Sequence, residues 1–285
     1  MGENMPKKIY MSVDFEGATG IVSPRHVAMG QSPEFERLRN CWQADVDALV
    51  QGALEGGADR ILLNESHGTM INLMADHLPA EVEFISGRIK PNLHMCGVDS
   101  GCEAAFLFTH SGAGIHHEGV LAHTFIGDFY RVKINGQTVG ELHMNAALAG
   151  YYGVPVALVV GDEQTCREGR DALGDVVCVA TKRGLDRYAA ILKSPVVTQR
   201  ELREAAKEAT RTASGFRPYR FASPVELEIE FLAVTAATAS SFIPGVERVG
   251  PRSIVYRHED YRTVYHMSWI FQLIAQGNYV QQDRL

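Results

Sequence analysis

Acidic and imidazole side chains follow three apolar runs of the sequence at the point where each run ends. Asp14 and Glu16 follow the first run, and His67 and His110 follow two later ones. In parallel α/β sheets the carboxyl ends of the strands share one edge, where their loops form a crevice. We therefore expect these four side chains to lie close together at that edge.

The residue types in this set indicate a divalent cation. Asp14 and Glu16 are two residues apart, so on an extended chain both carboxylates point the same way. Two carboxylates that face each other without a cation repel. Mixed oxygen and nitrogen ligands suit zinc or a similar ion that keeps an open position for water. Each residue taken alone is more often a turn, cap or locally bonded residue, so the joint placement carries the prediction.

The composition favours a folded enzyme and argues against a nucleic-acid partner. The 285-residue chain is 46% hydrophobic and 21% charged, as globular enzymes are. Its net charge of −7 comes from interspersed acidic and basic residues, so we expect no basic face for a polyanion. The 5 cysteines are scattered and form no CxxC pair, which argues against a disulfide framework or a structural zinc knuckle.

The start of the chain predicts no export signal. Residues 1–8 lack an apolar segment, and a strand-like run follows at once. Nowhere do about 18 apolar residues run together, the length that a transmembrane helix needs. We expect a soluble, cytoplasmic protein that neither spans a membrane nor is anchored to one.

The alternation of apolar, β-branched runs with amphipathic stretches predicts an α/β fold up to about residue 180. We expect a mostly parallel sheet flanked by helices, with an inserted hairpin and a smaller C-terminal α+β portion. The predicted strands of the parallel sheet are residues 8–13, 60–64, 82–86, 104–109, 156–160 and 176–180.

Helical spacing of apolar residues predicts a long helix over residues 33–56, which ends at a Gly-Gly pair suited to a C-cap. Asn135 and Gly136 form a turn dipeptide that suits a two-residue hairpin. Asp162 is expected to cap a helix that starts at Glu163. Further helices are predicted over residues 139–152 and 199–212.

The C-terminal third is predicted to be a separate small unit. Residues 215–224, with two prolines and a glycine, are expected to form a linker. The elements predicted after it are strands at 225–231 and 252–257 and a terminal helix at 261–276. The predicted domains are a catalytic α/β metallohydrolase domain over residues 7–214 and a smaller α+β portion over 215–285, packed on the first.

Histidines gather in one stretch, because 5 of the 11 lie between positions 110 and 143. His116 and His117 stand beside Glu118 in a Gly-rich loop and are expected to be solvated or part of a lid. The chain contains no HExxH motif, Walker A sequence or GxGxxG after a strand, and no organic cofactor is expected. The absence of a GxSxG nucleophile elbow disfavours serine hydrolase chemistry.

Five ordered motifs carry a resemblance to a known family. They are SVDFEGATG at 12–20, LLNESHG at 62–68, FLFTHS at 106–111, LAHTF at 121–125 and VGELHMNA at 139–146. Together they resemble the M55 metallopeptidases, the D-aminopeptidase family, from residue 8 to about residue 162, with weaker similarity onward. Glu65 stands where an Asp is more common in the family's pattern.

The resemblance implies a site with two zinc ions. By position, Asp14 matches the carboxylate that bridges both ions, and the other ligands are matched by Glu16, His67, His110 and Glu141. His123 matches the family's catalytic histidine, which lies beside the metals without binding them. Without the resemblance, the better interpretation of His123 is a core histidine satisfied by the backbone.

The function implied by the resemblance is that of a zinc-dependent aminopeptidase. It releases N-terminal residues, expected to be D-amino acids, from short peptides or aminoacyl amides through a metal-activated water. The resemblance also implies a homo-oligomer, a decamer of two pentameric rings. Two alternatives stay open: a binuclear metallohydrolase of a different amide or ester, and a non-catalytic metal-dependent binding protein. His123 argues against the second, because binding alone needs no residue beside the ligands.

Overall fold

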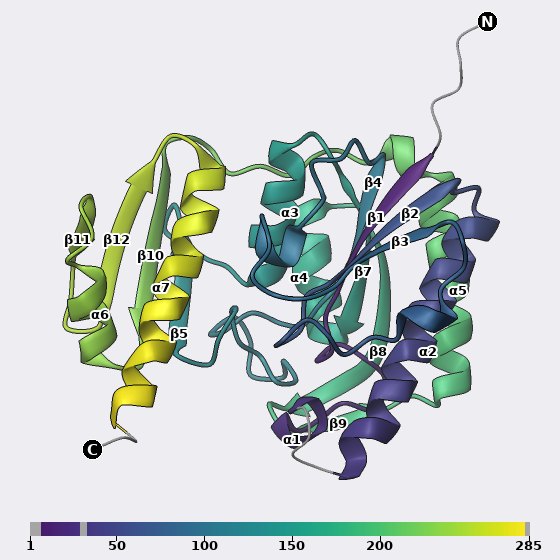
Figure 1. Cartoon of the computed structure of the whole chain (residues 1–285), viewed down its shortest axis with the longest axis horizontal. Coiled ribbons are helices and arrows are strands. Elements are labelled where there is room, and N and C mark those ends of the chain that lie inside the picture. The colour runs from purple at the N-terminus through teal and green to yellow at the C-terminus, as the bar shows by residue number, and fades with distance from the viewer. Residues whose placement is uncertain (1–6, 29–32, 283–285) are drawn as a thin grey trace, which may run out of the picture.

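Two sheets organise the molecule, a seven-stranded one in the larger part and a five-stranded one in the smaller part (Figure 1). The structure is a computed structural model, and it describes residues 7–28 and 33–282. Residues 1–6, which bear on the prediction of no export signal, lie outside the described residues. No described helix is long and apolar enough to cross a membrane.

The large sheet has the strand order β3-β2-β1-β4-β7-β8-β9, and all neighbours are parallel except the edge strand β9. Its strands are β1 Lys8–Val13, β2 Arg60–Glu65, β3 Val82–Ile85, β4 Ala104–Phe108, β7 Val156–Asp162, β8 Val177–Asp186 and β9 Ala189–Leu192. All six predicted strands form, which confirms the α/β prediction. The short strand β9 was not predicted, because it pairs with β8 alone and its four residues show no alternation.

The chain extends the large sheet in both directions from β1. β2 and β3 lie on one side of β1, and β4 and β7 lie on the other. At the end of β1, Val13 is paired with Glu65 on one neighbour and with Phe108 on the other. In open α/β sheets, the crevice outside the carboxyl ends at such a switch point is where ligands bind. The loops after β1, β2 and β4 therefore meet there.

Helices cover both faces of the large sheet (Figure 1). Helices α2 (Pro33–Glu55) and α5 (Pro195–Arg211) share one core with alternate residues of β1 such as Met11. On the other face, Tyr10 packs in a second core with residues of α3 (Glu141–Tyr151) and α4 (Glu163–Leu173). This division follows from the alternation of side chains along a strand. A short helix, α1 (Pro24–Val27), precedes α2.

The predicted helices form with small shifts at their ends. α5 begins at Pro195, four residues before its predicted start, because a proline fits the first position of a helix. The Asp162 cap is confirmed, since its Oδ1 accepts a hydrogen bond from the Thr165 backbone N at 2.7 Å. α3 begins at Glu141 after the N-cap Gly140.

The small sheet is antiparallel, in the order β11-β12-β10-β5-β6, and α6 (Val234–Ser240) and α7 (Tyr261–Gln282) pack against it. Its strands are β5 Phe129–Ile134, β6 Gln137–Thr138, β10 Val225–Phe231, β11 Val246–Arg248 and β12 Ser253–His258. The predicted hairpin is β5–β6. α6 and β11 were not predicted, because each is too short to show a period.

The small sheet draws strands from both sides of residue 214. β5 lies within the range 7–214 but pairs with β10, which lies in the range 215–285. Between residues 216 and 224, in the segment predicted to be a linker, the structure has no helix or strand. The division into domains at residue 214 stays a prediction.

Candidate metal centre

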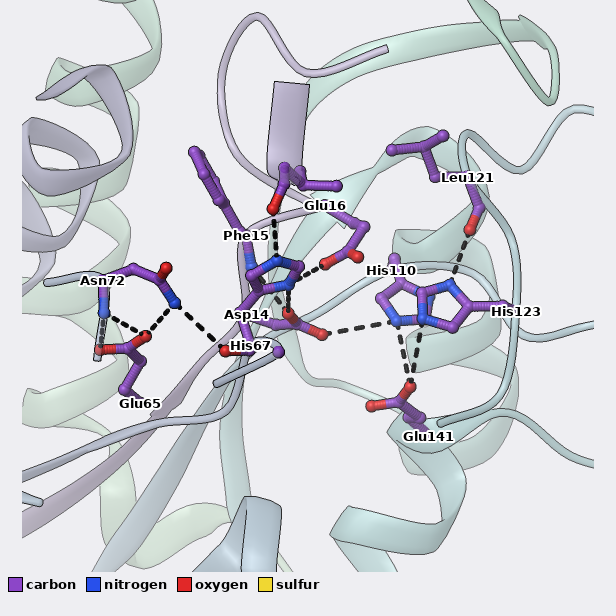
Figure 2. A network of polar contacts seen from close by, with 12 residues as sticks. Asp14, Phe15, Glu16, Glu65, His67, Asn72, His110, Leu121, His123 and Glu141 are labelled. Atoms are coloured by element: carbon purple, nitrogen blue, oxygen red, sulfur yellow. Dashed lines mark hydrogen bonds and ion pairs between the residues drawn. The ribbon is translucent and has the colours of Figure 1, made fainter. Parts of the chain in front are cut away.

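All five predicted ligands lie in one cluster at the carboxyl edge of the large sheet (Figure 2). Asp14 and Glu16 follow β1, His67 follows β2, and His110 follows β4; Glu141 is the first residue of α3. Four of them are buried, and the His67 side chain is 12% exposed. The convergence predicted from the strand ends is therefore present.

Asp14 lies between the two imidazoles and faces both (Figure 2). Its Oδ1 is 3.1 Å from His67 Nδ1, and its Oδ2 is 3.4 Å from His110 Nε2. His67 Nδ1 also lies 2.9 Å from Glu16 Oε2, and His110 Nε2 lies 3.1 Å from Glu141 Oε1. One nitrogen of each imidazole thus faces two carboxylates. Asp14 is shared between the group that contains His67 and the group that contains His110.

Backbone carbonyls fix the orientation of both rings. His67 Nε2 donates to the carbonyl of Val27 at 3.0 Å, and His110 Nδ1 donates to the carbonyl of Ser111 at 3.0 Å. The other nitrogen of each ring then faces the carboxylates. If that nitrogen carried no proton, its lone pair and those of the carboxylate oxygens would repel each other. A proton or a metal ion between them removes that repulsion. Metal-binding histidines commonly donate their second ring N–H to such a carbonyl.

The charges of the cluster favour a cation. Burial lowers the pKa of His67 and of His110, but the facing carboxylates outweigh burial and raise both pKa values well above the ordinary range. Burial raises the pKa of Asp14, but hydrogen bonds from His110 and His67 outweigh it and hold that pKa well below its usual value. Three carboxylates in one buried place attract positive charge.

The donor set fits zinc in chemistry and in spacing. Zinc ligands lie about 2.0–2.2 Å from the ion, so two ligands of one tetrahedral ion are about 3.3 Å apart. The four nitrogen–oxygen distances in the cluster lie between 2.9 and 3.4 Å. Ligand atoms of Asp14, Glu16 and His110 all lie within 4.8 Å of one another. The residues therefore suit two ions, one on each side of Asp14.

Side chains of β8 and of α2 hold the loop that carries Asp14 and Glu16. The buried Lys182 donates from Nζ to the carbonyls of Glu16 at 2.7 Å and Ala18 at 2.8 Å. Thr181 Oγ1 donates to the carbonyl of Gly17, and the carboxylate of Asp45 accepts from the Thr19 backbone N. These bonds fix the loop before any ligand arrives.

Close backbone contacts bring the ligand loops together. A Cβ at Gly17 would lie 2.1 Å from the carbonyl oxygen of Thr109, so only glycine lets this loop pass the end of β4. A Cβ at Gly140 would lie 2.5 Å from the Cα of Gly112, so the start of α3 touches the loop after His110. Gly140 and Gly112 allow Glu141 to reach His110.

Glu65 is not part of the cluster but supports it. Its carboxylate accepts from the backbone N of Asn72 and Leu73 and from Asn72 Nδ2, and Asn72 Nδ2 also lies 3.2 Å from the carbonyl of His67 (Figure 2). This network closes the loop after β2. Glu65 therefore has a structural role here.

His123 lies beside the cluster. Its ring stacks on that of His110, with centroids 3.9 Å apart, and its Nδ1 donates to the carbonyl of Leu121 at 2.8 Å. Its Nε2 is 3.9 Å from Glu141 Oε1. Burial and then the charge of His110 lower the pKa of His123. The geometry suits both a ligand and a neutral residue that accepts a proton.

Three residues near the cluster were missed by sequence reasoning. His94, in a 3-10 turn away from the strand ends, lines a cavity beside the cluster and stacks on Phe125. Glu168, on α4, accepts hydrogen bonds from Ser111 Oγ and the Gly112 backbone N beside His110. Lys182 lies on β8, two residues beyond the predicted strand at 176–180, so nothing in the sequence marked it as buried. A glutamate on a polar helix such as α4 carries no signal either.

The cluster opens into a cavity of about 180 Å³ that His94, His123 and Phe125 also line. His116 and His117 do not reach it. They are exposed and line a neighbouring cavity of about 460 Å³.

Comparisons with known proteins identify the family of this chain. The model of the M55 peptidase family, described as D-aminopeptidase, matches residues 7–270. The D-aminopeptidase of Bacillus subtilis (strain 168) is 32% identical over 270 residues, which cover 94% of this chain and 97% of that protein. A solved structure, described as the Zn-dependent D-aminopeptidase DppA from Bacillus subtilis, a self-compartmentalizing protease, has a TM-score of 0.90 and 31% identity, and covers 94% of this chain and 98% of its own. With a family match along nearly its whole length, the chain belongs to the M55 peptidases, the D-aminopeptidase family.

Proposed function

We propose that this member of the family is a zinc-dependent aminopeptidase that releases N-terminal D-amino acids from short peptides or aminoacyl amides. The observation that carries the proposal is Asp14, whose two carboxylate oxygens face two separate imidazole–carboxylate groups. The likeness to DppA, described as Zn-dependent, supports zinc as the metal.

In this proposal zinc would be held by Asp14 together with Glu16 and His67 on one side of the cluster, and by Asp14 together with His110 and Glu141 on the other. The backbone bonds of the two imidazoles support these roles, because each leaves the inward nitrogen free to bind an ion.

Zinc bound here supplies a Lewis acid that polarises the scissile carbonyl and lowers the pKa of a water. His123 is assigned the proton transfers and is not counted among the ligands. Its Nδ1–H is held by Leu121, so its Nε2 is the nitrogen that faces the cavity. Because the pKa of His123 is lowered, its ring is neutral near pH 7 and accepts a proton at Nε2, which it then donates to the leaving amine.

The small size of the cavity at the metal centre supports removal of one terminal residue at a time. A volume of about 180 Å³ is smaller than the roughly 300–1,000 Å³ of pockets for drug-sized ligands.

The proposal extends to assembly and location. A homo-oligomer, with a decamer of two pentameric rings as the arrangement, is supported by the likeness to a protease described as self-compartmentalizing. Its mass in solution, measured by light scattering, tests this. We place the protein in the cytoplasm, which agrees with the scattered cysteines.

A panel of D- and L-aminoacyl amides and dipeptides, assayed with and without a chelator, tests the proposed function. We expect cleavage of the D-substrates that a chelator abolishes and added zinc restores, and an inactive Asp14→Asn variant. Cleavage of the L-substrates alone would favour a different binuclear metallohydrolase. Bound zinc without cleavage of any substrate would favour a binding protein.

A further inference from the structure

A second cavity, of about 460 Å³, adjoins the cavity of the metal centre, and His123 lines both. Its walls come from the loop between β4 and β5, from the tip of the β8–β9 hairpin and from Leu232, which follows β10. A peptide whose first residue fills the small cavity needs room for the rest of its chain. The second cavity provides that room on the His123 side.

The charges along this path differ at its two ends. In the proposed function the carboxylates of Asp14, Glu16 and Glu141 hold zinc, and as acceptors they offer no hydrogen-bond donor to the free carboxylate of a short peptide. Among the described residues that line the two cavities, Arg187 is the only lysine or arginine. Arg187 is therefore the side chain that offers a permanent positive charge to a peptide carboxylate.

The guanidinium of Arg187 is available for a ligand. Its Cζ lies 5.6 Å from the ring centroid of Tyr188, which also lines the cavity, and no described carboxylate lies within 4.0 Å of its side-chain nitrogens. The neighbouring Asp186 accepts instead from the backbone N of Arg187. An arginine presents paired N–H groups that match a carboxylate.

The backbone fixes Arg187 relative to His123. The carbonyl of Arg187 accepts from the Leu121 backbone N at 2.8 Å, and the carbonyl of Leu121 accepts from His123 Nδ1 at 2.8 Å. Two hydrogen bonds thus join the hairpin tip to the ring of His123. Substitution of the Arg187 side chain leaves both bonds in place.

From this arrangement we infer that the second cavity binds the part of a short peptide that leaves on hydrolysis, and that Arg187 receives its free carboxylate. The inference rests on the proposed aminopeptidase function. Hydrolysis adds one water across the peptide bond, so the leaving product is an amino acid or shorter peptide with a new amino group. The preferred substrates are then short peptides with a free C-terminus, and Arg187 determines that preference.

Two peptides that differ only at the C-terminus test this, D-alanyl-D-alanine and D-alanyl-D-alanine amide. We expect wild-type protein to favour the free acid by about 10-fold or more in kcat/KM, through KM, as a charge-assisted hydrogen bond provides. Arg187→Met should remove the preference, and Arg187→Lys should keep part of it. Arg183→Met is the matched control, because Arg183 is an exposed arginine of the same hairpin outside the cavity.

Equal cleavage of both peptides by wild-type protein would overturn the inference while leaving the aminopeptidase function intact. An equal loss of activity on the free acid and on the amide in Arg187→Met would also overturn it. So would loss of the preference for the free acid in Arg131→Met with the preference retained in Arg187→Met. Arg131 contacts Tyr130 of the cavity wall from outside, with 5.5 Å from Cζ to the ring centroid. Failure of wild-type protein to cleave either peptide would instead contradict the proposed function.

Discussion

The ring of His123 stacks on that of the proposed ligand His110, yet loss of His123 and loss of a ligand should have different effects. In the proposed mechanism the ligands hold the ions, whereas His123 transfers protons. His123→Ala is therefore expected to lower kcat by about 100-fold or more while the zinc content stays that of wild type. Steady-state kinetics and metal analysis of the same sample check this.

The control for this variant is His258→Ala, because His258 is exposed on β12 and lines neither cavity. Near-normal turnover of His123→Ala with full metal content would show that His123 is not catalytic. Loss of zinc from the variant would make His123 a ligand.

Lys182 acts on the metal centre from a distance in our account. Its Nζ bonds to the carbonyls of Glu16 and Ala18 hold the ligand loop, and methionine has a similar length without the donor. We expect Lys182→Met to weaken zinc binding by about 10–100-fold, as loss of support behind a ligand does. Competition with a fluorescent zinc chelator measures this, and Lys193→Met, at an exposed lysine, is the control. Unchanged affinity would mean that the loop holds its shape without Lys182.

At the scale of elements, Asp45 joins α2 to the loop after β1 and makes stability depend on pH. Burial raises the pKa of Asp45 from 3.8 to about 6 in the folded protein. The folded state then holds the proton more tightly than the unfolded chain does. The contribution of Asp45 to stability is therefore highest below about pH 4, falls as pH rises to about 6 and stays low above that, by about 3 kcal/mol in total.

Asp45→Asn removes this titration. Relative to wild type, its free energy of unfolding should be about 1–3 kcal/mol larger at pH 8 than at pH 4, because only wild type loses the contribution of Asp45 as pH rises. Urea denaturation with a chelator present, so that metal binding does not contribute, measures the difference. Asp99→Asn, at an exposed aspartate, should show no such change. Parallel pH profiles of wild type and Asp45→Asn would contradict the assignment.

The elements that the sequence predicted are those with a strong period. Strands such as β1 and β7 are buried apolar runs, and α2 buries Phe35, Leu38 and Trp42 at helical spacing. α6 and β11 have seven and three residues, too few for a period. The pairing of β5 with β10 is also absent from local sequence, because it joins segments about 95 residues apart.

The candidate site was predicted to a similar extent and for a related reason. Strand ends mark Asp14, His67 and His110, because topology alone brings these positions together. Glu141 and His123 followed only from the resemblance. Lys182 and Glu168 were missed, since their importance lies in backbone groups that they contact across the fold.

At the scale of the whole molecule, the two sheets contribute differently to function. The proposed ligands all come from loops of the large sheet and the start of α3. The cavity beside them also has Leu232 from the small-sheet part in its wall, beside the β8–β9 hairpin tip. In this arrangement the large sheet holds the metal centre, while elements of both parts shape the space for the substrate.

The proposed function depends on the binding of zinc on both sides of the Asp14 carboxylate. Anomalous diffraction from crystals of the zinc-loaded protein, recorded on both sides of the zinc absorption edge, locates such ions. We expect two zinc peaks, one on each side of the Asp14 carboxylate, each about 2.0–2.2 Å from its nitrogen and oxygen ligands. A map with no zinc between Asp14 and the imidazoles of His67 and His110, or with zinc bound only elsewhere, would contradict the proposed function.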